Sequence, residues 1–390
     1  MFQFILLNFF FQATVAVVSP YTQILLRNKG YSHSLVGVIV ALSQVACVFA
    51  PLLLSAIVDK TRKTRLMFVV LMVLCVLFFV PAALSKSIPL TIVAFLLSMG
   101  MFHSIHPISD GYQNRILDGD ARRYGIARAA GTMGYVLALV MFGLLNYPDE
   151  TNNRSICACF AIMALLFVIV VFFIPRDLPP QKEERDEAKT AAGKRVFSRR
   201  FYLMMLVLGI SRVAHAVPDK LLSSYMVEVL GLGGDFALFV SLGAFSEFVM
   251  MIIGGYLLQK NKTTPYILIL LSAVALAVRL AIYRIFPSVT GLVFAQLLHS
   301  MTFGAFHIGT TKFIAQNVDK EHYSLAMSFY WAIATSLPNM LGTLFGGFVI
   351  DNLGYPNLFV IYMVFPIAAV IIALCFRKTL DVHGSKVRPL

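Results

Sequence analysis

The sequence predicts an all-α membrane protein with twelve transmembrane helices in two pseudo-symmetric six-helix bundles. The chain is 59% hydrophobic and only 13% charged, with a mean hydropathy of +0.81, a composition typical of membrane proteins. Apolar stretches of roughly 20 residues recur along the chain, and each is long enough to cross the hydrocarbon core of a bilayer. The two halves of the chain also resemble each other at an offset of about 200 residues, which predicts a duplicated unit.

The apolar stretches define the predicted spans in order. They cover about 3–27, 32–58, 66–85, 88–114, 124–147, 155–174, 201–229, 236–258, 264–284, 288–316, 323–350 and 355–376. One long hydrophilic stretch separates six spans from six. We therefore expect an N-terminal bundle over 1–174, a cytoplasmic linker over 175–200, a C-terminal bundle over 201–378 and a cytoplasmic tail over 379–390.

The basic residues are distributed unevenly between the loops. Alternate loops and the tail hold 23 of them, whereas the opposite loops hold five, which are Arg27, Lys29, Lys86, Arg154 and Arg284. The positive-inside rule places the basic side, and with it both termini, in the cytoplasm. This topology accounts for the net charge of +13, so the charge does not indicate a nucleic-acid partner.

The repeat between the halves breaks at ionisable positions. The Leu53–Lys60 stretch matches Ile253–Lys260, and His106 matches His307. Arg128, however, matches Met327, and Glu247 matches Cys47. A purely structural network of ion pairs would tend to recur in both halves. Charges placed in only one half instead favour a single site between twin halves near the bilayer midplane, as in many secondary carriers.

Ionisable residues lie inside several predicted spans, where a charge costs several kcal/mol unless it faces a protein interior or a water-filled cavity. They are Asp110, Arg128, Arg212, His215, Asp219, Glu247, Arg279 and His299. Because both signs occur on several helices, the set indicates a translocation pathway. The alternative is a buried ion network that only fixes helix packing.

Spacing predicts how some of these side chains meet. Asp110 and Arg128 lie at similar depth near the cytoplasmic ends of consecutive helices, so they can pair. The pair is either permanent or opened by a substrate, because the planar guanidinium also suits a carboxylate, a diol or a nucleobase edge. Arg212, His215 and Asp219 share one face of helix seven, and Pro218 beside them predicts a local break in that helix.

Proton carriage is expected from a buried acid. Glu247 is the first candidate, because burial and a nearby cation act in opposite directions on a carboxyl group. Asp219, together with His215 on the same helix face, is its rival. His299 is a candidate relay, since imidazole titrates near neutral pH.

Several motifs carry a resemblance to a known family. The loop Asp59-Lys60-Thr61-Arg62-Lys63-Thr64-Arg65 is similar to the cytoplasmic motif after helix two of the major facilitator superfamily, although Ser55 and Arg62 stand where glycines are usual. Further segments resemble motifs of the lactose permeases, the nucleoside-proton symporters and the phenylpropionate permeases. They are Arg123–Tyr135 on helix five, Pro107–Asp110 on helix four, Ser246–Glu247 on helix eight and Gln296–His307 on helix ten.

The resemblance implies proton-coupled symport of a small organic solute by alternating access. It implies that Asp110 and Arg128 hold the solute and that Tyr135 stacks on its ring. It also implies that Glu247, Arg279 and His299 bind the ligand or carry the proton. We add Arg212 to the predicted substrate-binding residues. Those permeases carry an acid where Thr302 stands, so another group must carry the proton here. The resemblance also implies that the loop residues Asp59, Arg62, Lys63 and Arg65 take part in the conformational change of the carrier.

We expect a monomer in a plasma membrane, the bacterial inner membrane, with protons, lipid and an aromatic or other organic acid, a nucleoside or a sugar as partners. No cofactor, metal or nucleic acid is expected. An exporter or uniporter of the same fold stays open, because alternating access is reversible. An enzyme or a scaffold is disfavoured, because the chain lacks His-Glu-x-x-His, Gly-x-Ser-x-Gly and Walker A motifs and has short loops.

Overall fold

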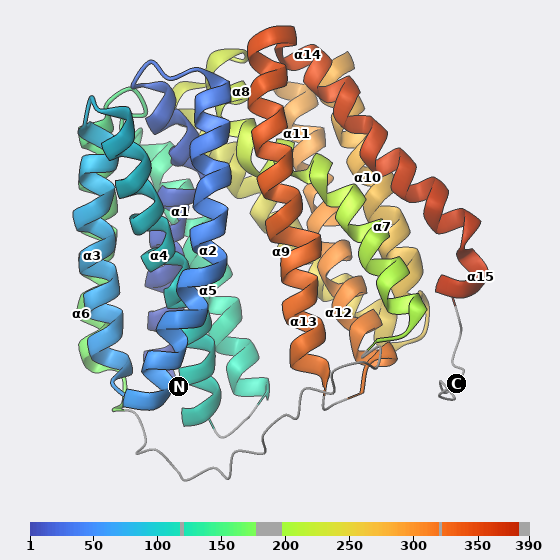
Figure 1. Cartoon of the computed structure of the whole chain (residues 1–390), viewed down its shortest axis with the longest axis horizontal. Helices are drawn as coiled ribbons and strands as arrows, with labels where there is room; N and C mark the ends of the chain where they lie inside the picture. The colour runs from blue at the N-terminus through green and yellow to red at the C-terminus, as the bar shows by residue number, and fades with distance from the viewer. Residues whose placement is uncertain (118–120, 177–196, 320–321, 382–390) are drawn as a thin grey trace. The chain divides into compact units, whose positions relative to one another are not determined.

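A computed structural model describes residues 1–117, 121–176, 197–319 and 322–381 of the chain. These residues form helices and connecting segments (Figure 1). In the first half the helices are α1 (Phe2–Arg27), α2 (His33–Thr61), α3 (Thr64–Leu84), α4 (Ile88–Ile116), α5 (Ala121–Leu145) and α6 (Asn153–Phe173). In the second half they are α7 (Arg199–Ala216), η1 (Val217–Leu221), α8 (Leu222–Glu228), η2 (Gly233–Asp235), α9 (Phe236–Gln259), α10 (Pro265–Ile285), α11 (Val289–Leu297), η3 (Ser300–Ala305), α12 (Phe306–Asn317), α13 (Tyr323–Trp331), η5 (Ala332–Ser336), α14 (Leu337–Cys375) and α15 (Arg377–Leu380).

The predicted all-α fold and its twelve spans are confirmed. Eleven helical stretches among the described residues are long and apolar enough to cross a membrane, and the last of them, Leu325–Cys375, is 51 residues long. Inside it Gly354 has φ 78° and ψ 169°, a conformation that glycine adopts without steric cost. This break divides the stretch into two spans at the position that the sequence predicts.

Contacts divide the chain into two compact units. The first consists of Met1–Lys182 and Lys220–Ser241, and the second of Glu183–Asp219 and Leu242–Leu390. The 220–241 segment of the first unit comprises the end of η1, α8, η2 and the start of α9. This segment makes its contacts with α1 and α5.

Each unit contains one pair of closely packed helices with a glycine at the contact. In the first unit α1 packs on α5, and a Cβ at Gly134 would clash with the backbone of Phe9. In the second unit α7 packs on α14, and a Cβ at Gly342 would clash with the backbone of Val213. A larger residue at either glycine would therefore force the two helices apart.

The 220–241 segment is joined to α1 and α2 by polar contacts. Arg27 Nε donates to Glu228 Oε1 at 2.7 Å, and His33 Nε2 lies 3.0 Å from Glu228 Oε2. Ser224 Oγ donates to Gln23 Oε1 at 3.0 Å. These contacts explain why this part of the second half belongs to the first compact unit.

Glu228→Gln is expected to lower the free energy of unfolding by about 1 kcal/mol. The amide keeps the shape of the side chain but loses the charge that holds Arg27, in a position too exposed for a larger effect. Thermal unfolding of the purified protein measures this change. Asp235→Asn, which removes an exposed acid of the same segment, is the control, and equal melting temperatures for the two variants would contradict the assignment.

The loop after α2 contains a strained residue. Arg62 caps the helix with φ 53° and ψ 31°, the left-handed conformation, which explains why a glycine is usual at this position of the family motif. Arg65 Nε donates to the carbonyl oxygen of Pro175 at 3.3 Å. The side chain of Asp59 lies outside the described part of the structure, so the conformational role of this loop stays a prediction.

Arg62→Gly is expected to stabilise the protein by up to about 1 kcal/mol. The left-handed conformation costs a residue with a Cβ roughly 1–2 kcal/mol, and the extra freedom of glycine in the unfolded chain cancels part of the gain. Lys63→Gly is the matched control, because Lys63 has φ −103° and gains nothing from glycine. An unfolding temperature for Arg62→Gly below that of the wild type would contradict the strain.

Candidate functional site

The first unit brings together an arginine, a histidine and a carboxylate from two adjacent helices. Arg128 on α5 donates through Nη1 to Asp110 Oδ1 on α4 at 3.0 Å. The same Nη1 lies 3.0 Å from His106 Nδ1, and His106 Nδ1 lies 3.5 Å from Asp110 Oδ2. The predicted meeting of Asp110 and Arg128 is therefore confirmed, and His106 joins them.

His106 Nδ1 faces both the guanidinium of Arg128 and the carboxylate of Asp110. A guanidinium has only donors, so the contact with Arg128 uses the lone pair of a neutral ring, whereas a hydrogen on Nδ1 would be directed to Asp110. His106 can therefore act as a partner of either charged group.

Other groups complete the first cluster. The Tyr124 side chain hydrogen-bonds Asp110, and the Phe11 ring contacts the His106 ring edge-on at 5.7 Å. Tyr135, the predicted stacking residue, is half-buried on α5. It lies two helical turns after Arg128 and hence on the same face of α5.

The second unit contains a longer chain of hydrogen bonds around the buried Arg279 of α10. This arginine donates to the Tyr283 hydroxyl at 3.0 Å, to His299 Nδ1 at 2.9 Å and to Thr302 Oγ1 at 3.3 Å. It also donates to Gln296 Oε1. His299 Nε2 in turn lies 3.4 Å from Glu247 Oε2 on α9. Glu247, Arg279 and His299, to which the resemblance assigns ligand or proton handling, thus lie next to one another.

The direction of this chain follows from the same argument as in the first unit. His299 Nδ1 accepts from Arg279, so the ring is neutral and directs its Nε2 hydrogen toward Glu247. A second proton on His299 would break the bond from Arg279. The carboxylate of Glu247 is therefore the group at the end of the chain that can take up a proton without disrupting it.

Arg212, His215 and Asp219 each have partners on other helices. Arg212 is buried, lies over the ring of Phe306 at 4.3 Å and approaches the Thr302 carbonyl oxygen at 3.4 Å. The His215 ring lies 6.0 Å from that of His299. Asp219 Oδ2 accepts from Asn339 Nδ2 at 3.1 Å. The predicted irregularity at Pro218 is confirmed as the π-helical segment η1.

Ring side chains form a row along η3 and its two ends. The Phe303 ring lies 6.0 Å from His299 at an interplanar angle of 20° and 6.1 Å from His307 at 9°. Arg212 lies 5.2 Å from the same phenyl ring. Single-turn π segments such as η3 are frequent at functional sites, and this one presents an aromatic surface next to the charged cluster.

The charges of the second cluster balance. Arg212 and Arg279 are offset by Glu247 and Asp219, and both carboxylates act electrostatically on Arg212 and His299. Protonation of Glu247 leaves a net charge of +1 in a largely dehydrated place. Among the described residues, no group of His, Cys, Asp and Glu side chains is arranged to hold a metal ion.

The neutral partners of these charges are not among the predicted site residues. Gln296 and Asn339 carry no charge that would mark them in the sequence, although Gln296 is the first residue of the Gln296–His307 motif. His106 precedes Asp110 by four residues, and Tyr124 precedes Arg128 by four. This i, i+4 spacing, which places His106 and Asp110 on one helix face, is the signal that could have identified His106.

Comparisons with known proteins cover nearly the whole chain. The profile of the MFS_1 like family matches residues 2–361. The maltose permease of Geobacillus stearothermophilus is 23% identical over 98% of this chain and 95% of its own, and the probable 3-phenylpropionic acid transporter of Escherichia coli (strain K12) is 22% identical over 88% and 90%. A crystal structure of a mutant of the nucleoside transporter NupG superimposes with a TM-score of 0.82 at 15% identity, covering 97% of this chain and 99% of the other.

Proposed function

Because the chain belongs to the MFS_1 like family of major facilitator transporters, we propose that it is a proton-coupled symporter of a small organic solute. The family and its apolar helices make it an integral membrane transporter and not an enzyme. The proposal adds the coupling ion, the class of solute and the residues that handle each.

The hydrogen-bond chain from Arg279 through His299 to Glu247 supports proton coupling. Glu247 is half-buried, ends the chain, and is connected through a histidine whose neutral form the arginine maintains. An acid in such a place gains or loses a proton without rebuilding its surroundings. We assign the coupling proton to Glu247, and His299 connects this acid to Arg279. His215 and Asp219 support the site, because the His215 ring lies next to His299 and Asp219 acts on His299 electrostatically.

The charge balance of the second unit gives the proton a role in binding. When Glu247 is protonated, Arg212 and Arg279 outweigh the single charge of Asp219, and an anionic group is attracted in a low-dielectric surrounding. Release of the proton restores the balance and weakens this attraction. The solute and the proton would then bind together and leave together.

The groups around Arg128 favour a solute with hydrogen-bond acceptors and a ring. The guanidinium is shared between His106 and Asp110, so a carboxylate or diol can replace one of these partners. Tyr135 on the same face of α5 supplies a surface for stacking. Aromatic acids, nucleosides and sugars fit this description, and the relatives that transport a phenylpropionic acid, nucleosides and maltose by name agree with it.

A thermal-shift screen tests the solute class. The purified protein is melted with aromatic acids, nucleosides and sugars, and at least one class is expected to raise the unfolding temperature. The shift should disappear in Arg128→Ala and persist in Arg284→Ala, which removes an exposed arginine outside both clusters. A shift that survives Arg128→Ala would contradict the assigned role of Arg128.

The same proposal includes a monomer in the bacterial plasma membrane with cytoplasmic termini. The excess of basic residues in alternate loops supports the cytoplasmic position of the termini. A cysteine-reactive, membrane-impermeant label on intact cells tests it: a cysteine introduced at Lys86 is expected to react, and one introduced at Lys260 is not.

A further inference from the structure

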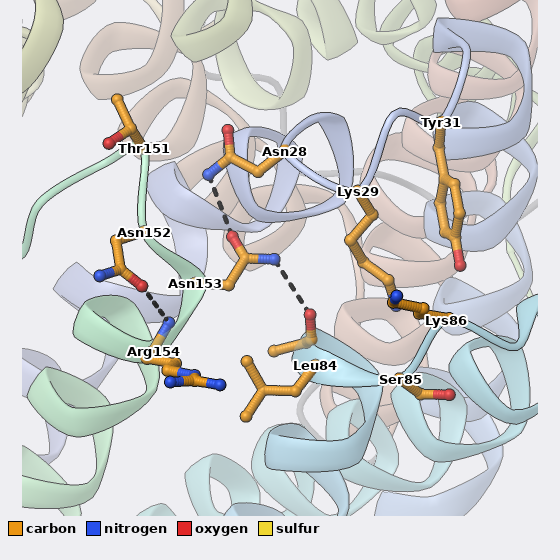
Figure 2. Close-up of a pocket in the computed structure, with 11 residues that line it drawn as sticks. Asn28, Lys29, Tyr31, Leu84, Ser85, Lys86, Thr151, Asn152, Asn153 and Arg154 are labelled. Carbon is orange, nitrogen blue, oxygen red and sulfur yellow. Dashed lines mark hydrogen bonds between the residues drawn. The ribbon is translucent and has the colours of Figure 1, made fainter.

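A hollow of about 650 Å³ lies in the first unit where helices end and begin (Figure 2). It is lined by residues of the α1–α2 and α3–α4 connections and by the start of α6. Arg128, by contrast, lies near the start of α5, and α5 leads to this hollow only at its other end. The hollow is therefore a place separate from the first cluster.

Hydrogen bonds from Asn153 hold the connections around the hollow together. Its Nδ2 donates to the carbonyl oxygens of Leu25 and Ala83, each at 3.0 Å. Asn28 Nδ2 donates to Asn153 Oδ1 at 3.0 Å. Figure 2 shows Asn153 in the middle of the lining residues, with dashed lines to both sides. The frame of the hollow is thus fixed by the end of α1, the end of α3 and the start of α6.

The lining of the hollow is positively charged. Lys29, Lys86 and Arg154 line it, and none of its described lining residues is an acid. In Figure 2 Arg154 stands on one side of Asn153, and Lys29 and Lys86 stand on the other.

Two acids precede the lining residue Thr151 in sequence. Glu150 accepts a hydrogen bond from Asn28 Nδ2 through its backbone oxygen, and its carboxylate lies next to Gly233. Asp149 accepts hydrogen bonds from the backbone and hydroxyl of Thr151 at 2.9 and 2.7 Å.

The position of these cations is unexpected from topology alone. The predicted outer loops hold five basic residues, and three of them converge on this hollow. A fourth, Arg27, is bound to Glu228. Loops on that side are normally depleted of Lys and Arg, so three cations around one hollow indicate an anionic ligand rather than an orientation signal.

Lys29 is held in place and sensitive to pH. Its Nζ donates to the carbonyl oxygen of Ala82 at 2.6 Å and to Thr91 Oγ1 at 2.5 Å, which leaves one proton of the ammonium for a ligand. Burial lowers the pKa of Lys29 to about 8. Its positive charge is therefore present at neutral pH and is lost as the pH rises through about 8.

We propose that this hollow binds the phosphate group of an anionic lipid headgroup. Lys29, Lys86 and Arg154 would surround the phosphate, and α4 and α6 begin here behind the capping residues Ser87 and Asn152, which adds the positive ends of two helix dipoles. A lipid is the source because the hollow lies at the ends of membrane spans, where headgroups are located.

Binding of short-chain phosphatidylglycerol to the delipidated protein in a zwitterionic detergent tests the proposal, with thermal stabilisation as the readout. Phosphatidylcholine and inorganic phosphate are titrated in parallel. The double variant K86Q/R154Q is expected to bind phosphatidylglycerol about 30-fold more weakly, because each cation near an anionic lipid changes the affinity roughly fivefold. R284Q, which removes the remaining outer-loop cation outside the hollow, should bind like the wild type.

The pH supplies a second readout. Wild-type affinity for phosphatidylglycerol should fall between pH 7 and pH 9.5, and Lys29→Met should remove this fall. Equal affinity of the double variant and the wild type would overturn the site. Binding of inorganic phosphate without binding of phosphatidylglycerol, with the same dependence on Lys86 and Arg154, would overturn the lipid as its source.

Discussion

Arg128→Ala is expected to reduce solute uptake by at least about 100-fold. The guanidinium, which contacts Asp110 and His106 at 3.0 Å, is the group that we propose to bind the solute, and alanine has no donor in its place. Two hydrogen bonds from a charged group contribute about 3 kcal/mol together, which is about two powers of ten in an equilibrium. Initial uptake rates in proteoliposomes, with the solute that the thermal-shift screen identifies, measure the effect.

A double variant separates a binding role of Arg128 from a structural one. If the arginine binds the solute, Asp110→Ala/Arg128→Ala remains inactive, because no group replaces the guanidinium. Recovery of uptake in the double variant would show that Arg128 serves only to neutralise Asp110. Arg128→Lys supplements the test, since lysine keeps the charge but not the planar fork that can hold two acceptors at once.

Glu247→Gln is expected to abolish accumulation against a concentration gradient while leaving solute exchange. Glutamine resembles the protonated carboxyl group but cannot release a proton, so the carrier can move between its states only when loaded with solute. Exchange of labelled for unlabelled solute, and net uptake under an imposed pH gradient, are measured on the same proteoliposomes. Loss of both activities, or retention of both, would contradict the assignment of the proton to Glu247.

The control for this experiment is Glu228→Gln. Glu228 is also an acid in a helix of the second half, but it contacts Arg27 and His33 and not the cluster around Arg279. Its variant should keep both exchange and accumulation. The comparison therefore separates the loss of a particular proton site from the general effect of removing a carboxylate.

Hydrophobic length and charge distribution were sufficient to predict the spans, because a bilayer restricts which segments can cross it. The pairing of Asp110 with Arg128 followed from their depth on consecutive helices. The contacts of Glu228 with Arg27 and His33 did not follow, because they join residues about 200 positions apart at helix ends that carry no motif. The π segments were also unpredictable, except at Pro218, because they depend on tertiary packing.

The roles of the histidines also depend on tertiary contacts that the sequence does not reveal. His299 was identified through its motif, whereas His106 was not, although both accept a hydrogen bond from an arginine through Nδ1. Composition cannot distinguish a histidine that fills the core from one that links a cation to an acid. The difference lies in the neighbouring helices, α5 for His106 and α10 for His299, which the sequence does not place.

Coupling of solute entry to protons can be measured as solute-induced proton movement. Proteoliposomes in a weakly buffered medium receive the solute without any imposed gradient, and the external pH is followed. The account predicts that the medium becomes more alkaline as solute enters with the wild type, and that Glu247→Gln produces no such change. Solute entry through the wild type at constant external pH would show that the carrier is not coupled to protons.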